Sequence, residues 1–234
     1  MKSKALLIGN SDGIGLAVTK ELLNTGWTVV GLSRSPSPVN YPSYEHIVTG
    51  VQGNEYPAIL KSVLDKEESI EVCIYCAGIG ELLDPSDMEN EVEIFNVNLI
   101  GLVKTASIVL PIMVGRGTGH FIGLSSVADE LLSAEAPSYH ASKAGFSNYL
   151  EGLALALRPK GVYVTNLRFG FVDTKMAKGD VKPFMMSVEK AVSHVLKCMK
   201  KKPVRYTAPR FINPLIIFRR RMMRLGILIN DLKK

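Results

Sequence analysis

The chain has 234 residues, of which 47 % are hydrophobic and 21 % charged, and its formal net charge is +6. This length and apolar content suit one folded domain with a sizeable core, and they exclude an intrinsically disordered chain. Three cysteines are too few for a disulfide framework, which excludes a small secreted scaffold. The first apolar run ends at Gly9 and is too short for a signal peptide, so we expect a cytoplasmic protein.

Apolar runs alternate with longer segments along most of the chain. The runs predict strands near residues 4–8, 28–32, 45–48, 72–75, 120–125, 162–168 and 204–207. The longer segments predict helices near residues 13–25, 55–66, 88–114, 137–158 and 187–201. This alternation predicts an α/β fold, a doubly wound parallel sheet with helices on both faces and right-handed crossovers. We expect one domain over residues 1–207 and a basic, amphipathic C-terminal tail over residues 208–234.

A glycine-rich turn follows the first predicted strand and reads Gly9-Asn10-Ser11-Asp12-Gly13-Ile14-Gly15. Glycines allow a tight turn and let the backbone approach a diphosphate, and the free N–H groups of the following helix bind the anion. The spacing, G-x-x-x-G-x-G, differs from the usual dinucleotide fingerprint. The segment therefore predicts a dinucleotide site, and a turn without a ligand is the alternative.

The second predicted strand ends in Ser33 and Arg34, where a dinucleotide site meets the adenosine ribose. NAD sites have an acidic residue at this point, whereas an arginine accommodates the 2′-phosphate of NADP. No acidic residue occurs between Glu21 and Glu45. Ser33 and Arg34 therefore favour NADP(H) over NAD(H); the alternative is that Arg34 only faces solvent.

Cys73 and Cys76 form a C-x-x-C pattern on the fourth predicted strand. Side chains three residues apart on a strand point to opposite faces of the sheet. The pattern therefore favours two buried strand residues over a redox or zinc pair, and we expect no metal site in the chain.

Asn98 and Ser126 are polar residues near predicted apolar elements. Asn98 lies inside a predicted helix, and Ser126 ends the segment Gly123-Leu124-Ser125-Ser126 after an apolar strand. Ligands bind outside the carboxyl ends of such strands, so a hydroxyl there can bond a substrate oxygen. A serine hydrolase is unlikely on sequence grounds, because its nucleophile elbow needs a second glycine, and Val127 stands in that place.

Tyr139 and Lys143 are four residues apart at the start of a predicted helix, which puts both side chains on one face. A phenol has a pKa near ~10, and a neighbouring ammonium lowers that pKa by favouring the phenolate. The pair predicts a proton donor and acceptor for general acid–base catalysis. The alternative is an ordinary surface pair. His140 projects away from Tyr139, and we expect it to face solvent or to be structural.

These motifs together resemble the short-chain dehydrogenase/reductase family over about residues 4–207. The glycine turn, Tyr75-Cys76-Ala77-Gly78, Asn98, Ser126, Tyr139 and Lys143 occur in the family order. Ser126 is preferred to Ser125 because it lies thirteen residues before Tyr139, as in the family. A later segment resembles the family's P-G-x-V-x-T motif and reads Phe169-Gly170-Phe171-Val172-Asp173-Thr174.

The chain departs from the family pattern at several positions. Ile8 replaces a threonine or serine, and Phe169 replaces a proline. Tyr75 and Cys76 replace two asparagines, so the contact that braces the central sheet must be made differently. Asp12 stands where family members that use NADP often have a basic residue.

The resemblance implies a Rossmann fold and hydride transfer between nicotinamide C4 and a carbonyl or a secondary alcohol. In that reaction Tyr139 exchanges the proton, Lys143 assists Tyr139 and bonds the nicotinamide ribose, Ser126 holds the substrate oxygen and Asn98 positions a water. Further implied cofactor contacts come from Ala77, Gly78, Gly170, Val172 and Thr174. A homodimer or homotetramer is expected. The alternative function is a regulatory protein that binds NADP(H) and has lost turnover.

The C-terminal segment is strongly basic. Residues 200–234 contain eleven lysines and arginines and one acidic residue, Asp231, so residues 1–199 carry a net charge of −4. We expect a helix from about Phe211 that is separable from the domain and buries Leu215, Ile216, Met222, Met223, Leu225 and Ile229. Its partner is the active-site rim, a second subunit or the inner face of a membrane. Nucleic-acid binding is not expected, because the cluster lacks a reading motif.

The predicted substrate loop is short and runs from Asp173 to about Met186. Apolar residues within it predict a hydrophobic carbonyl or alcohol as substrate: Met176, Phe184, Met185 and Met186. The pattern does not distinguish a steroid, a fatty acyl chain or an aromatic ketone.

Overall fold

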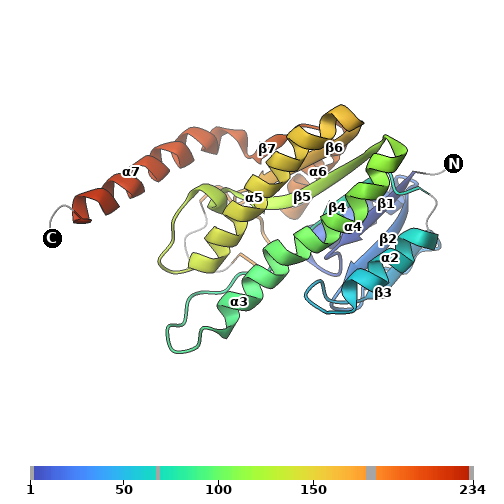
Figure 1. Cartoon of the computed structure of the whole chain (residues 1–234), viewed down its shortest axis with the longest axis horizontal. Coiled ribbons are helices and arrows are strands. Elements are labelled where there is room, and N and C mark those ends of the chain that lie inside the picture. The colour runs from blue at the N-terminus through green and yellow to red at the C-terminus, as the bar shows by residue number, and fades with distance from the viewer. Residues whose placement is uncertain (1–2, 67–68, 178–182, 232–234) are drawn as a thin grey trace.

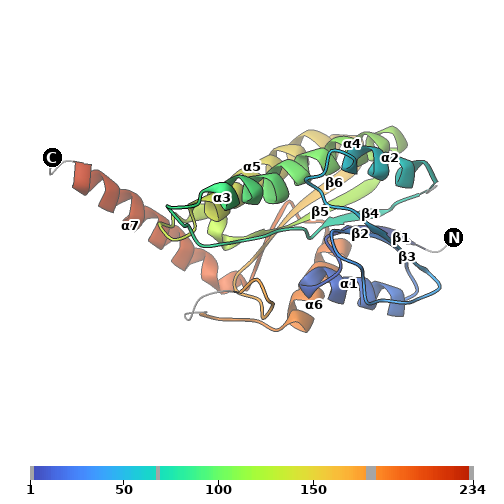
Figure 2. The same cartoon turned by 90° about the horizontal axis from the view of Figure 1, so that it is seen from below.

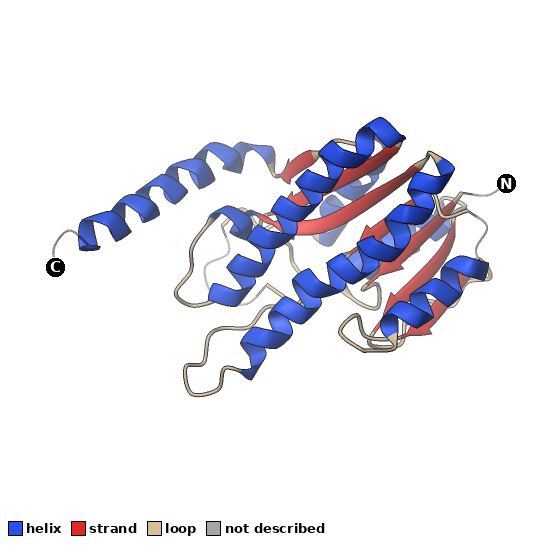
Figure 3. Ribbon diagram, in the orientation of Figure 1, coloured by secondary structure: helices blue, strands red, loops and turns tan. Residues whose placement is uncertain are grey.

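The computed structural model describes residues 3–66, 69–177 and 183–231. In these residues seven strands form one parallel sheet: β1 (Lys4–Ile8), β2 (Thr28–Ser33), β3 (Tyr44–Val48), β4 (Val72–Tyr75), β5 (Gly119–Ser126), β6 (Val162–Phe169) and β7 (Arg205–Ala208). Their order across the sheet is β3-β2-β1-β4-β5-β6-β7, and Figure 3 shows the strands of this sheet with helices packed around them. The predicted doubly wound parallel sheet is confirmed. The order reverses between β1 and β4, which is where such sheets bind ligands.

The helices are α1 (Gly13–Asn24), α2 (Tyr56–Lys66), α3 (Glu89–Phe95), α4 (Gly101–Arg116), α5 (Pro137–Leu157), α6 (Val188–Lys201) and α7 (Asn213–Asp231), and all but α7 belong to the body of the molecule (Figure 1). Figure 2 shows α1 and α6 on one face, with α2, α4 and α5 on the other. The central strands β1, β4 and β5 are buried along nearly their whole length because both of their faces are covered. Cys73 belongs to the core under α2, α4 and α5, whereas Cys76 packs against the opposite core, so the predicted buried-strand arrangement is confirmed.

The helix predicted near residues 88–114 is not continuous. A π-helical turn, Asn96–Ile100, separates α3 from α4. A π turn holds one residue more than an α turn and is often found at functional sites. The segment Glu89–Arg116 is long and apolar enough to cross a membrane, but half of its most apolar window is buried inside the fold, as in a core helix.

The basic tail forms α7 after a short turn, Arg210–Ile212. Figure 1 shows α7 extending beyond the rest of the molecule from the end of β7. Of the residues expected to be buried, Ile216 packs against the rest of the protein, whereas Leu215, Met222 and Leu225 are exposed, so their burial against a second subunit or a membrane stays a prediction. The side chain of Ile229 and residues 232–234 lie outside the described part of the structure.

Candidate active site

Tyr139 and Lys143 lie on the inward side of α5, one turn apart. The helix starts at Pro137, whose fixed backbone angle suits the first helical position. Lys143 is only 4 % exposed, and its Nζ donates to the carbonyl of Leu124 at 3.1 Å. The same Nζ lies 5.9 Å from the centroid of the Tyr139 ring and 4.7 Å from that of Phe146. The predicted pairing of a phenol with a buried ammonium is present.

Ser126 ends β5, and its side chain lies close enough to the Tyr139 hydroxyl to lower the pKa of Tyr139. Its Oγ also accepts from the backbone N–H of Ala128 at 3.2 Å and so caps the 3₁₀ turn Val127–Glu130. Ser125 points elsewhere and shares a 2.8 Å hydrogen bond with Ser147. The choice of Ser126 over Ser125 therefore agrees with the geometry.

Asn98 is fully buried in the π turn beside the site. Its Nδ2 donates to the carbonyl of Ile79 at 2.9 Å and to Oγ of Ser142 at 3.0 Å, and its Oδ1 accepts from the N–H of Ile79 at 2.8 Å. Both amide protons are thus used by the protein. Asn98 holds the loop after β4 against α5, and its role in positioning a water stays a prediction.

The π turn is braced by a residue that sequence reasoning did not assign to the site. The hydroxyl of Tyr75, at the end of β4, donates to the carbonyl of Val97 at 2.6 Å. Gly101 makes room for this contact, because a Cβ there would lie 2.5 Å from the Tyr75 hydroxyl. The Tyr75 hydroxyl therefore ties the end of β4 to the π turn, at a position where the family pattern has an asparagine. The signal was the departure from the N-N-A-G motif itself.

Burial governs the ionisation of Tyr139 and Lys143. It raises the pKa of Tyr139 above that of a free phenol, the hydrogen bond from Ser126 lowers it in part, and the charge of Asp129 raises it again. Burial also lowers the pKa of Lys143 to about 8, against smaller upward effects of Asp129 and Cys76. The expectation that Lys143 lowers the pKa of Tyr139 below its usual value is wrong here, because desolvation of the phenolate is the larger effect.

The glycine-rich turn has the shape that a close approach to a ligand requires. Gly9 has a φ of +84°, and a Cβ there would lie 2.5 Å from the backbone of Ala77. A Cβ on Gly15 would lie 2.2 Å from the carbonyl of Gly9. Asp12 caps α1 by accepting from the N–H of Gly13 at 2.8 Å. The turn therefore places the N-terminus of α1 at the crevice between β1 and β4.

The loop after β6 lies against this turn. The methyl carbon of Thr174 is 3.5 Å from the position of a Cβ on Gly13, and Nζ of Lys175 is 2.7 Å from Oδ2 of Asp12. The side-chain hydrogen bond from Lys175 lowers the pKa of Asp12. Earlier in the loop, Gly170 donates to the carbonyl of Ala208 and Val172 pairs with Met186. Of the predicted residues of this loop, Thr174 thus lies against the glycine-rich turn, whereas Gly170 and Val172 pair with Ala208 and Met186.

Gly78 leaves a space at the centre of the site. A Cβ there would meet Oδ1 of Asn98 at 3.4 Å, Nζ of Lys143 at 3.6 Å and the terminal methyl of Met176 at 3.8 Å. Gly80, two residues on, packs against the Tyr139 ring. A flat ring system bound here would be in reach of the Lys143 ammonium, so these residues fit a nicotinamide.

The residues predicted at the adenosine end behave differently from one another. Nδ2 of the buried Asn10 donates to Thr19 at 3.0 Å and to the hydroxyl of Tyr44 at 2.8 Å. Oγ of Ser33 donates to the carbonyl of Ser35 at 2.9 Å. Arg34 is exposed and makes no hydrogen bond or ion pair with the residues that the structure describes. Of the three side chains, that of Arg34 is available to a phosphate.

Two further residues of the turn were predicted to contact the cofactor. Ser11 is partly exposed between Asn10 and Asp12. Ile14 packs its side chain against the core under α1 and α6, so its contribution to a ligand is limited to the main chain. His140 is half-buried, and its Nδ1 is 3.1 Å from the carbonyl of Leu131, which agrees with the structural role expected for it.

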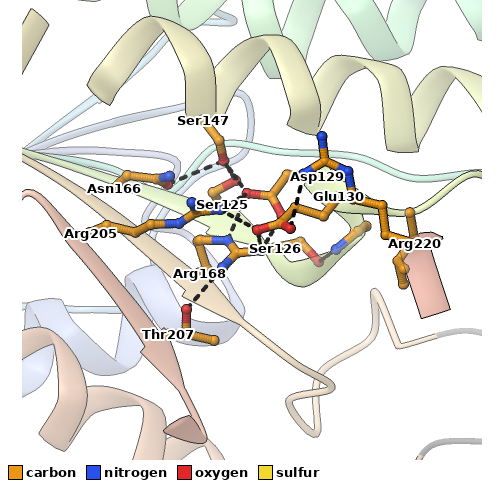
Figure 4. Close-up of polar contacts among 12 residues, drawn as sticks. Ser125, Ser126, Asp129, Glu130, Ser147, Asn166, Arg168, Arg205, Thr207 and Arg220 are labelled. Carbon is orange, nitrogen blue, oxygen red and sulfur yellow. Dashed lines mark hydrogen bonds and ion pairs between the residues drawn. The ribbon is translucent and has the colours of Figure 1, made fainter. Parts of the chain in front are cut away.

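A buried ion pair behind Ser126 was missed by sequence reasoning (Figure 4). Arg168 on β6 binds Asp129 with two bonds, Nε to Oδ2 at 2.7 Å and Nη2 to Oδ1 at 2.6 Å. The two side chains are 2 % and 1 % exposed. Ser147 donates to Oδ2 of Asp129 at 2.6 Å, and Nη1 of Arg168 donates to Thr207 at 3.0 Å. The turn that follows Ser126 is therefore tied to β6, β7 and α5.

The neighbouring carboxylate extends this network toward the surface. Glu130 accepts from Arg168 at 2.9 Å and is paired with Arg205 of β7. Its Oε2 also accepts from Nη1 of Arg220 of α7 at 3.3 Å. The network thus connects the turn Val127–Glu130 after Ser126, called the serine turn below, to the tail helix. Its arginines come from β6, β7 and α7, so no local sequence motif contains it.

Comparison with known proteins agrees with this geometry. The family model described as short chain dehydrogenase matches residues 3–183. A 3-oxoacyl-acyl-carrier-protein reductase FabG from Vibrio harveyi is 30 % identical over 185 residues, covering 74 % of this chain and 75 % of the relative.

Solved structures show the same fold. A short-chain dehydrogenase from Streptomyces avermitilis matches with a TM-score of 0.83 and 21 % identity, over 98 % of this chain and 97 % of that one. One from Burkholderia cenocepacia, in complex with NADP, matches with a TM-score of 0.80 and 20 % identity, over 99 % and 95 %. Since the family model covers most of the chain, and the residues that its chemistry needs converge on one site, this protein belongs to the short-chain dehydrogenase family of oxidoreductases.

Proposed function

We propose that the protein is an NADP(H)-dependent oxidoreductase that interconverts a hydrophobic carbonyl compound and its secondary alcohol. The observation that supports this most directly is the convergence of Ser126, Tyr139 and Lys143 beside the space left by Gly78. A protein that only binds the dinucleotide has no need for a hydroxyl pair at this point.

The bound nicotinamide supplies the hydride chemistry, and the chain's own residues orient the reactants and move the proton. Ser126 and Tyr139 both direct a hydroxyl at the place of the substrate oxygen. Tyr139 gives its proton to that oxygen during reduction and takes it back during oxidation. The Lys143 ammonium stabilises the phenolate that forms, because a positive charge close to the ring offsets part of the desolvation.

NADP(H) is proposed over NAD(H) because of Arg34. Its guanidinium follows β2, is exposed and has the planar donor geometry that binds a phosphate through two hydrogen bonds. The related Burkholderia structure, which contains NADP, is consistent with this choice. Asp12 does not oppose it electrostatically, because its carboxylate is paired with Lys175.

A hydrophobic substrate is proposed from the loops around the site. Exposed apolar side chains occur on the loop after β4, on the loop after the serine turn and on the loop after β6: Leu82, Leu132, Met176, Phe184 and Met185. The first two loops touch, since the N–H of Leu83 donates to the carbonyl of Glu135 at 2.7 Å. Residues 178–182 of the predicted substrate loop lie outside the described part of the structure.

The proposal is tested by assaying a panel of ketones, 3-oxoacyl esters and secondary alcohols through nicotinamide absorbance, with the parent protein and two variants. Tyr139→Phe removes one hydroxyl, so the fold and NADPH affinity stay and kcat falls at least ~10²-fold. Tyr149→Phe, on the same helix but away from the site, is the matched control and keeps full turnover. A Tyr139→Phe variant as fast as the parent would contradict the mechanism, and a parent that binds NADPH without turnover would favour a regulatory protein.

A further inference from the structure

The tail helix carries an apolar stripe that the rest of the protein leaves uncovered. Phe211, Leu215, Phe218, Met222 and Leu225 are between 48 % and 63 % exposed. Their alternating spacing of four and three residues places them on one side of a helix. Two phenylalanines and three aliphatic side chains in one exposed row are more than the scattered apolar residues of an ordinary surface.

The opposite side of α7 faces the body of the protein. Ile212 and Ile216 are 7 % and 6 % exposed, and Arg220 reaches Glu130 of the serine turn. Met223 lines a groove together with His140 and other residues of α5. These contacts fix the rotation of the helix, so the apolar stripe faces away from the sheet. Figures 1 and 2 show the carboxyl-terminal end of α7 extending beyond the other elements.

Arginines border the stripe on both sides. At about 100° per residue, Arg219 and Arg221 lie roughly 80° to either side of its centre, and both are exposed. Residues 210–230 contain five arginines and no acidic residue. The surface therefore combines an apolar centre with a purely positive border.

An apolar stripe bordered only by arginines favours an anionic bilayer over a second copy of α7 as the partner of this surface. A second copy of α7 packed on the first would bring arginine borders together without a carboxylate from either helix to pair them, which opposes helix pairing. An anionic bilayer offers acyl chains to the apolar stripe and phosphate oxygens to the arginines at the same depth. We propose that α7 lies on the surface of an anionic lipid bilayer, with the stripe from Phe211 to Leu225 in the interface. This proposal does not depend on the reaction that the active site performs.

The test uses full-length protein and sedimentation with vesicles of phosphatidylcholine alone or mixed with phosphatidylglycerol. We expect the protein to sediment with the anionic vesicles only, and less so as salt is added. Arg219→Gln with Arg221→Gln should weaken this binding on the order of 30-fold, about fivefold for each charge. Phe218→Ser should weaken it without removing any charge. The control, Lys20→Gln with Lys61→Gln, removes two exposed charges from α1 and α2 and should bind like the parent.

Three results would overturn the proposal. The first is a parent protein that stays in solution with anionic vesicles. The second is a control variant that loses as much binding as the two stripe variants, which would reduce the effect to general charge attraction. The third is a Phe218→Ser variant that binds vesicles normally but changes from a dimer to a monomer in velocity sedimentation. That outcome would assign the stripe to a second copy of the chain. Thermal melts of each variant confirm that the exposed substitutions leave the fold intact.

Discussion

The catalytic pair shows how burial and charge compete at single residues. The spacing of Tyr139 and Lys143 could be read from the sequence, because it follows from the period of a helix. The direction of the Tyr139 pKa shift could not, because it depends on how completely the phenol is desolvated. Both residues are displaced toward their uncharged forms by burial, while Ser126 favours charge on Tyr139, and Asp129 and Cys76 favour charge on Lys143.

Lys143 should leave a measurable pH dependence in stability. Its pKa is about 8 in the folded protein and near 10.5 when free, so between these values the unfolded chain holds a proton that the folded chain has released. Stability then rises with pH relative to a variant without the amine. Urea unfolding of the parent and Lys143→Met from about pH 8 to pH 10 should show a difference that grows by up to about 1.4 kcal/mol per pH unit. Tyr139 is present in both proteins, so its own titration, at a raised pKa, cancels from the difference. A flat or falling difference would contradict the burial of a titrating amine.

Arg34 is the residue on which the cofactor preference depends. Arg34→Ala removes a charge-assisted contact to the 2′-phosphate, so NADPH affinity should fall at least ~10-fold while NADH affinity changes little. Titration of both cofactors by fluorescence measures the two effects separately. Arg158→Ala, an exposed arginine at the amino-terminal edge of β6, is the control and should alter neither affinity. Equal losses for the two cofactors would remove the specificity argument.

Among the elements, the strands and helices of the body were predictable, whereas the π turn was not. Continuous apolar runs such as Leu6–Ile8 indicate buried strands, and the structure has strands in all seven predicted places. Residues 96–100 have the same apolar pattern as the helices around them. The extra residue of the π turn is held by tertiary contacts, namely Tyr75 on the Val97 carbonyl and Asn98 on Ile79. Such tertiary contacts do not change the spacing of apolar residues in the sequence, so the π turn could not be predicted from it.

The turn after Ser126 should depend on the buried ion pair for its stability. Arg168→Met removes both guanidinium bonds to the buried Asp129 and leaves it only the longer contact with Arg205 at 3.9 Å, and breaking a buried pair from one side costs about 3–5 kcal/mol. Chemical denaturation measures the loss. Arg205→Met is the matched control, because Arg205 is 41 % exposed and its ion pairs with Glu130 and Glu151 should contribute under ~1 kcal/mol. Equal effects of the two substitutions would show that the buried pair has no special role.

For the molecule as a whole, the sequence was sufficient to predict the sheet and the convergence of the site. Residues from β1, β4, β5 and α5 meet because the carboxyl ends of parallel strands share one edge. The same reasoning could not predict the network of Asp129, Glu130 and Arg168, because Arg168 lies on β6, 39 and 38 residues away from the two carboxylates of the turn. It also left the partner of the tail open, because exposure of the apolar stripe appears only once the inward side of α7 is known.

The ring of Phe211 belongs both to the stripe of the tail helix and to the surroundings of the active site. It stands edge-on to the ring of Phe184, in the loop after β6, with 5.1 Å between centroids. With α7 bound to a bilayer, this aromatic contact would place the entrance of the active site next to the acyl chains of the lipids. A water-insoluble ketone would then reach the enzyme by lateral diffusion within the leaflet. Under those conditions the apparent KM would follow the mole fraction of substrate in the lipid and would be insensitive to the volume of buffer.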